Sequence, residues 1–185
     1  MRGFVNRLAV ILTLFYPLAV YFGLSYVEPW QIALALAILL AIRLLAGKTG
    51  TAGKGYRWLI IVLILYCGLS IFHNDQISLR LYPILVNLGL LTIFAASLYY
   101  PPPIIERLAR LNIPDLPEKG IVYTRKVTQI WCLFFTFNGL AAFYTALWCS
   151  MKWWSLYNGF IAYVLIGLLM AGEYLVRIKT QHYAR

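Results

Sequence analysis

Hydrophobic residues along this chain fall into six long runs that are separated by short polar segments. The runs cover residues 8–26, 30–46, 58–72, 82–99, 127–149 and 156–176. Each is close to the ~20 residues that an α-helix needs to cross a ~30 Å hydrocarbon core, although the third is short. The pattern predicts an all-α, polytopic membrane protein whose six transmembrane helices form three hairpins, as a single integral membrane domain over residues 1–185.

Basic residues fall almost entirely in alternate gaps between these runs. If all six runs cross the bilayer, 14 of the 16 lysines and arginines lie on one side, and only Arg80 and Lys152 lie on the other. Short cytoplasmic loops are enriched in Lys and Arg, so both termini are expected in the cytoplasm. Because residues 8–24 lack a small-x-small site and exceed the usual length of a signal core, we expect this run to be retained as the first helix.

Composition excludes an ordinary soluble domain. The chain is 62% hydrophobic and only 12% charged, whereas soluble domains are nearer half apolar. Its net charge of +10 sits at predicted membrane edges, where anionic headgroups attract each basic residue by about 1 kcal/mol. Membrane lipids are therefore the expected partners, and no nucleic-acid partner is expected.

The segment between the fourth and fifth runs carries the main cytoplasmic feature. After three prolines, apolar residues at 104, 105, 108 and 111 share one helical face, whereas Glu106, Arg107 and Arg110 share the other. This spacing predicts a short cytoplasmic interfacial helix that Pro114 and Pro117 end. It serves either as a surface connector or as a docking site for a protein or a lipid headgroup. The candidate contact residues are Arg107, Arg110, Arg125 and Lys126.

Nothing in the sequence indicates a catalytic, cofactor or metal site. Residues 47–49 (GKT) resemble the end of a phosphate-binding loop, but the glycine required five positions earlier is Ile42. The three cysteines have no CxxC spacing, and His73 and His182 lie on opposite sides in the predicted topology. The polar outer turn of the second hairpin holds His73, Asn74 and Asp75.

Polar side chains inside the predicted spans are the remaining candidates. Asn138 and Thr145 share a face with small residues in the fifth helix, and Asn87 and Asn158 lie in the fourth and sixth helices. Such residues either join helices by hydrogen bonds or line a polar cavity that binds a substrate.

Glu173 is the only carboxylate inside a predicted span. Arg177 follows it by one turn and is expected to form an ion pair with it. The alternative is a role for Glu173 in proton or substrate coupling. Asp75 and Glu173 lie on opposite membrane faces, which argues against general acid–base catalysis by the pair.

Several motifs resemble known families over roughly residues 58–177. Residues 67–75 (CGLSIFHND) resemble the corresponding hairpin of the bacterial intracellular septation protein A family. A closer resemblance is to an inner-membrane family often encoded beside the fatty-acid-synthase-like enzymes that make aryl polyene lipids. It rests on residues 103–110 (PIIERLAR), 123–125 (YTR), 127–135 (VTQIWCLFF), 144–148 (YTALW) and 155–159 (SLYNG).

The resemblance implies a multi-pass protein of the bacterial inner membrane that takes part in building the envelope, and it brings no catalytic residue. One hypothesis is a non-enzymatic scaffold or accessory factor that contacts division, elongation or lipid-synthesis machinery. The alternative is a carrier or flippase for a lipid or an aryl polyene intermediate. A scaffold should be more sensitive to changes at Arg107 or Arg110 than at Asn138, and a carrier should show the opposite ranking.

Overall fold

A computed structural model describes residues 16–24, 26–46 and 53–182, and these residues form helices joined by short turns. About half of the first hydrophobic run, most of the glycine-rich segment at 47–55 and the side chain of His182 lie outside the described parts. The helices are α2 (Tyr16–Gly23), α3 (Pro29–Ala46), α4 (Gly53–His73), α5 (Gln76–Tyr99), α6 (Ile104–Ala109), α7 (Glu118–Trp148), α8 (Met151–Leu156), the π-helical turn η1 (Tyr157–Ile161) and α9 (Ala162–His182).

Four helical segments of the described residues are long and apolar enough to cross a membrane. They are Gly55–His73, Gln76–Tyr99, Glu118–Trp148 and Met151–Ile178, and Pro29–Leu45 forms a shorter apolar helix. The third to sixth predicted runs are therefore found as candidate spans. The second run is found as α3, which at 1.5 Å per residue is about 27 Å long.

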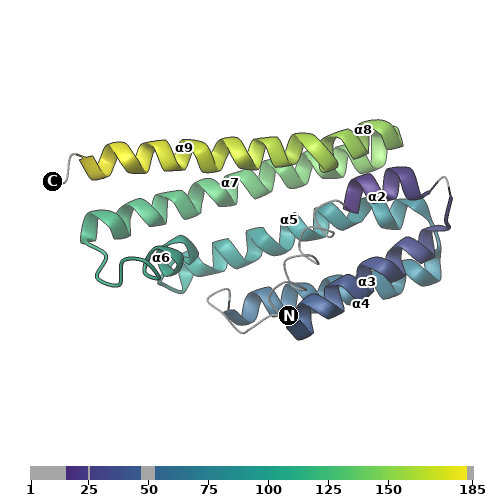
Figure 1. The fold of residues 1–185 in the computed structure, drawn as a ribbon, viewed down its shortest axis with the longest axis horizontal. Helices are drawn as coiled ribbons and strands as arrows, with labels where there is room; N and C mark the ends of the chain where they lie inside the picture. Colours follow the sequence, from purple (N-terminus) through teal and green to yellow (C-terminus); the bar gives the residue numbers. More distant parts are fainter. Residues whose placement is uncertain (1–15, 25, 47–52, 183–185) are drawn as a thin grey trace.

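The long helices lie side by side in an elongated bundle (Figure 1). Helix α5 packs along α7, α3 packs along α4, and α4 joins the two pairs by packing on α5. Helix α9 runs alongside α7 on the outer edge of the bundle, and α6 lies where α5 ends and α7 begins. Helix α2 packs against α8 and η1 at the opposite end. This arrangement leaves large apolar side chains on α9 exposed, as expected for a face that meets lipid.

Helix α2 is joined to the bundle at a backbone carbonyl that a proline in α5 leaves without its usual donor. Pro83 lies inside the helix and has no N–H to donate to the carbonyl of Leu79. The hydroxyl of Tyr16 on α2 donates to that carbonyl at 2.9 Å. The carbonyl of Pro17 in turn accepts a 3.2 Å hydrogen bond from Ser155 Oγ on α8. These two contacts satisfy buried backbone groups and fix α2 between α5 and α8.

Several helices extend beyond their predicted spans. Helix α7 begins at Glu118, directly after Pro117, although its apolar run starts only at residue 127. Hydrophobicity marks the part of a helix that meets lipid, whereas a charged first turn can continue the same helix into the headgroup layer. The structure therefore moves the N-terminal boundary of this helix by nine residues.

Candidate functional site

Two of the predicted polar side chains, Asn87 and Asn138, meet Tyr157 between α5, α7 and η1. Asn138 Nδ2 donates to Asn87 Oδ1 at 2.9 Å, and both side chains are buried. The hydroxyl of Tyr157 donates to Asn138 Oδ1 at 2.9 Å. Asn87 Nδ2 donates to the carbonyl of Pro83 at 2.8 Å. The asparagine pair thus hydrogen-bonds across the contact between the two helices, where the Cβ of Asn87 lies 3.3 Å from the position that a Cβ on Gly139 would occupy.

Asn158 and Thr145 form a second link between the last two spans. Asn158 Nδ2 donates to the carbonyl of Trp154 at 2.9 Å and to Thr145 Oγ1 at 3.3 Å. Thr145 Oγ1 donates to the carbonyl of Ala142 at 3.0 Å. The predicted face of the fifth helix therefore contacts the predicted asparagine of the sixth.

The π-helical turn η1 explains how Tyr157 enters this network, which the sequence analysis did not foresee. The N–H of Ala162 donates to the carbonyl of Tyr157, five residues earlier, so the turn contains one extra residue. Such π-turns occur frequently at functional sites. Gly159 in the same turn lets α2 approach, because a Cβ there would lie 3.1 Å from Leu18 Cγ. The YNG sequence at 157–159 is the available signal, but glycine alone does not indicate a π-turn.

A cavity of about 250 Å³ lies beside the asparagines, among the helices of the bundle. Its polar lining includes Asn87, Asn138 and Asn158, and Arg43 and Tyr56 also border it. The guanidinium of Arg43 lies over the Tyr56 ring, 5.0 Å from the ring centroid. The cavity thus combines amide groups and one cation with mostly apolar walls, which is the usual composition of a small-ligand pocket.

Glu173 lies about midway along α9. The hydroxyl of Tyr123 on α7 donates to the Glu173 carbonyl at 3.2 Å and to its Oε1 at 3.3 Å. The predicted ion pair with Arg177 is present at 3.9 Å. The i,i+4 spacing predicted Arg177 as a partner of Glu173, whereas Tyr123 is 50 residues away and carries no such signal. These contacts give Glu173 a role in joining α7 and α9.

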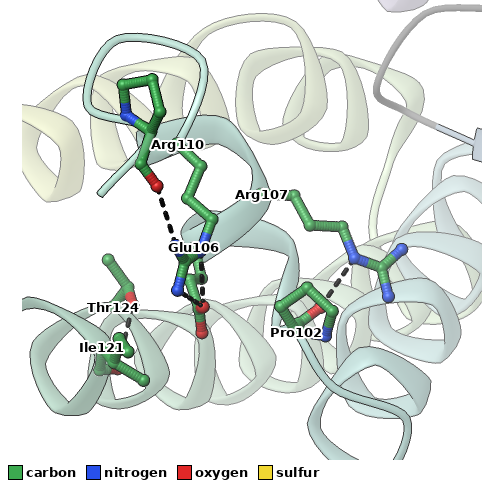
Figure 2. Close-up of polar contacts among 7 residues, drawn as sticks. Pro102, Glu106, Arg107, Arg110, Ile121 and Thr124 are labelled. Carbon is green, nitrogen blue, oxygen red and sulfur yellow. Dashed lines mark hydrogen bonds and ion pairs between the residues drawn. The ribbon is translucent and has the colours of Figure 1, made fainter. Parts of the chain in front are cut away.

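The residues of the predicted polar face of α6 differ in their surroundings. Glu106 is buried next to α7, and Arg110 donates to its Oε1 from Nε at 2.9 Å and from Nη2 at 2.8 Å (Figure 2). Arg110 Nη1 also donates to the carbonyl of Pro114 at 2.9 Å. Leu108 and Leu111 are exposed instead. The pair with Arg110 offsets part of the desolvation cost of burying this carboxylate, and helical periodicity gives no signal for such a pair.

The remaining predicted contact residues are Arg107, which is half-buried, and Arg125 and Lys126, which are exposed. Figure 2 shows Arg107 directed away from Glu106, with Nε donating to the carbonyl of Pro102 at 2.6 Å. Arg107 Nη2 donates to the carbonyl of Tyr100 at 3.2 Å. Arg125 and Lys126 are exposed on the first turns of α7. Arg107 and Arg110 therefore have different structural roles despite their shared predicted face.

The predicted outer turn joins two helical hairpins. Asn74 adopts a left-handed conformation with φ of 46°. Its Oδ1 accepts from the N–H of Trp30 at 3.0 Å, and its Nδ2 donates to Glu28 Oε2 at 3.1 Å. His73 Nδ1 lies 3.0 Å from the carbonyl of Leu69. The turn thus connects the start of α3 to the junction between α4 and α5.

Asp75 caps the first turn of α5. Its Oδ1 accepts from the N–H of Ser78 at 2.9 Å. Hydrogen bonds from Ser78 lower the pKa of the Asp75 carboxyl below its usual value, because they favour the ionised form. Asp75 therefore has a structural role at the helix N-terminus.

Arg80, one of the two basic residues on the predicted outer side, caps the end of α7. Its Nη2 donates to the carbonyls of Thr145, at 2.8 Å, and of Cys149. The carbonyl of Arg80 accepts from Trp154 Nε1 at 3.1 Å. A guanidinium placed there satisfies helix-terminal carbonyls and interacts favourably with the helix dipole.

Among the described residues, no group of three or more His, Cys, Asp or Glu side chains lies close enough to hold a metal ion. Cys67 is buried, whereas Cys132 and Cys149 are partly buried, and all three are free thiols.

Three curated proteins, each named inner membrane-spanning protein YciB, are similar to the chain. The protein of Serratia proteamaculans is 27% identical over 120 residues, which are 64% of this chain and 65% of that protein. The protein of Hydrogenovibrio crunogenus is 25% identical over 161 residues, which are 82% of this chain and 73% of that protein. The protein of Edwardsiella ictaluri is 29% identical over 111 residues, or 58% of each chain.

The YciB proteins are distant homologues of this chain. The chain covers just under two thirds of the Serratia protein and less of the Edwardsiella protein. No family model matches the chain, and no solved structure matches it. The predicted likeness to the septation protein A family is confirmed at this level, and the link to aryl polyene genes stays a prediction. With its apolar helices, the chain is an inner-membrane protein of the cell envelope.

Proposed function

We propose that the chain is a non-enzymatic scaffold or accessory factor that holds proteins of division, elongation or lipid synthesis at the inner membrane. The observation that supports this role is the fixed position of α6. Helix α6 packs against α7 with Glu106 buried, and Arg110 ties that carboxylate to the end of the same helix and to the carbonyl of Pro114. Leu108, Leu111 and Ile113 are exposed beside it, where the spans end. Exposed apolar side chains on a fixed support suit a protein contact.

The proposed topology has six spans, with the run at 8–26 as the first and α3 as the second. Both termini and α6 are then cytoplasmic, which follows the distribution of basic residues. Reporter fusions test this directly. A reporter that is active only in the cytoplasm should work after Arg185 and fail when inserted between His73 and Asn74. The opposite pattern would contradict the proposed orientation and place α6 on the outer face.

The buried polar network also supports a scaffold. Asn87 and Asn138 use their amide groups on each other, on Tyr157 and on the backbone. Interhelical bonds of this kind are each worth about 0.6–2 kcal/mol in membranes. They would hold the helices that carry α6 in one arrangement.

Site-specific photo-crosslinking in native membranes tests the scaffold. A crosslinking amino acid at Leu111 should capture envelope-synthesis or division proteins. The matched control is Leu168, which is 64% exposed on α9 and faces the expected lipid side, compared with 60% for Leu111. Equal recovery of the same proteins at both positions would refute a specific contact at α6.

A carrier for a lipid or polyene intermediate is the second candidate, because the 250 Å³ cavity has three asparagines in its lining. If the cavity binds such a ligand, Asn138→Leu should abolish its co-purification. Retention of the ligand by folded Asn138→Leu protein would exclude the cavity as its site.

A further inference from the structure

A second and larger hollow lies between α4, α5 and α6. It has a volume of about 930 Å³, in the upper part of the ~300–1,000 Å³ range of ligand pockets. Trp58 and Val62 on α4 and Leu88 on α5 line it, and Arg107 lies at the α6 end. Leu59 borders both this groove and the polar cavity.

Small residues on α5 create the groove. At Gly89 the helices touch, since Leu59 Cδ1 lies 2.1 Å from the position that a Cβ would occupy. Thr92 and Ala96 follow at one-turn intervals and are exposed, so α5 presents only small side chains to the groove at these positions. Here α4 and α5 therefore leave a channel between them.

The groove is long and apolar enough for a lipid chain. Its lining on α5 runs from Leu85 to Tyr100, which is about 22 Å at 1.5 Å per residue. Half of a ~30 Å hydrocarbon core is about 15 Å. Trp58, Val62 and Leu88 are each at least half exposed, so in a bilayer these walls meet acyl chains.

The α6 end of the groove carries a positive charge. Two backbone carbonyls, of Tyr100 and Pro102, hold the guanidinium of Arg107. The ion pairs among the described residues are Glu106–Arg110 and Glu173–Arg177, so no described carboxylate neutralises Arg107. A guanidinium positioned in this way matches the geometry of a phosphate group.

We propose that this groove binds an anionic phospholipid, with an acyl chain between α4 and α5 and the headgroup phosphate at Arg107. Charge and shape together favour this ligand, because the apolar channel ends at Arg107, a cation that no described carboxylate neutralises, where the spans meet the headgroup layer. The inference requires neither the scaffold nor the carrier role.

Native mass spectrometry of the full chain in detergent tests the proposal. The probes are phosphatidylglycerol and phosphatidylcholine with the same acyl chains. The chain should retain phosphatidylglycerol better, and Arg107→Gln should lower that retention by roughly tenfold, as expected for a hydrogen-bonded charge pair. Arg125→Gln, which makes the same charge change at an exposed site outside the groove, should change retention by less than about twofold.

A second pair of variants tests the channel separately from the charge. Ala96→Phe fills the groove at an exposed position and should lower retention of both lipids while leaving Arg107 intact. Arg107→Lys keeps the charge and should preserve part of the preference for phosphatidylglycerol. These variants decide the question if Arg107→Gln fails to fold. Equal losses for Arg107→Gln and Arg125→Gln, or full retention by Ala96→Phe, would overturn the proposal.

Discussion

Trp154 gives the sharpest test of the packing at the outer end of the bundle. Two tryptophans are adjacent in α8, but their environments differ: Trp154 is fully buried at 0% exposure, whereas Trp153 is 60% exposed. Trp154 Nε1 also donates to the carbonyl of Arg80. We therefore expect Trp154→Ala to destabilise the protein strongly and Trp153→Ala to have little effect.

The magnitude follows from two contributions. Removing a buried tryptophan leaves a cavity that typically costs about 3–5 kcal/mol. The lost hydrogen bond to Arg80 is a smaller part, on the order of 0.6–1.7 kcal/mol in a membrane protein. Trp154→Phe keeps most of the packing and should cost about 1 kcal/mol. An exposed substitution such as Trp153→Ala should stay within roughly 0.5 kcal/mol.

The assay is unfolding of the purified protein in mixed micelles as the fraction of a denaturing detergent is raised, followed by far-ultraviolet circular dichroism. The adjacent substitution is the control, because it removes the same side chain from the same helix. Equal shifts of the unfolding midpoint for Trp153→Ala and Trp154→Ala would refute the packing of α8 against α2 and the hydrogen bond from Trp154 to α5.

Three further predictions follow from the polar contacts and the buried thiol. Asn138→Leu should lower the unfolding free energy by about 1–3 kcal/mol in the same assay, because it leaves two partners unpaired, whereas Thr136→Val at an exposed position should change little. Asp75 has a lowered pKa in the folded state, so the stability that its ionised carboxylate contributes is present above the unfolded pKa of ~3.9 and is lost as pH falls through the folded pKa. Asp75→Asn should therefore reduce the loss of protein stability in acid. An identical dependence of stability on pH in the two proteins would contradict the capping role. Cys67, at 2% exposure, should react with a maleimide only as the protein unfolds, which mass spectrometry of partly unfolded samples can follow.

The sequence predicted the helical class and most of the spans because lipid contact requires long apolar runs. Such runs specify little about helix ends outside the lipid, so α7 begins at Glu118 rather than at residue 127. Periodicity predicted a short helix at α6 but could not indicate that Glu106 is buried and paired with Arg110. The side of a short helix that is buried depends on which neighbour it meets.

Candidate residues were easier to find than their partners. Polar side chains within apolar runs identified Asn87, Asn138 and Asn158, and the structure places all three around one cavity. The hydrogen bond from Tyr157 to Asn138 lies at the π-turn, where one extra residue shifts the helix face and leaves no periodic signal. The sequence did not predict the groove between α4 and α5 either, because the groove arises from small residues on α5 and from the distance between the two helices.

Leu59 forms a wall of both the polar cavity and the lipid groove, and this shared wall makes the proposed roles separable. A ligand in the cavity depends on the amides that surround Asn138, whereas a phospholipid in the groove depends on the guanidinium of Arg107. Because those two groups border different hollows, a lipid lost on Asn138→Leu but kept on Arg107→Gln belongs to the cavity. The reverse result assigns it to the groove, and a protein contact at Leu111 that survives both substitutions requires neither ligand.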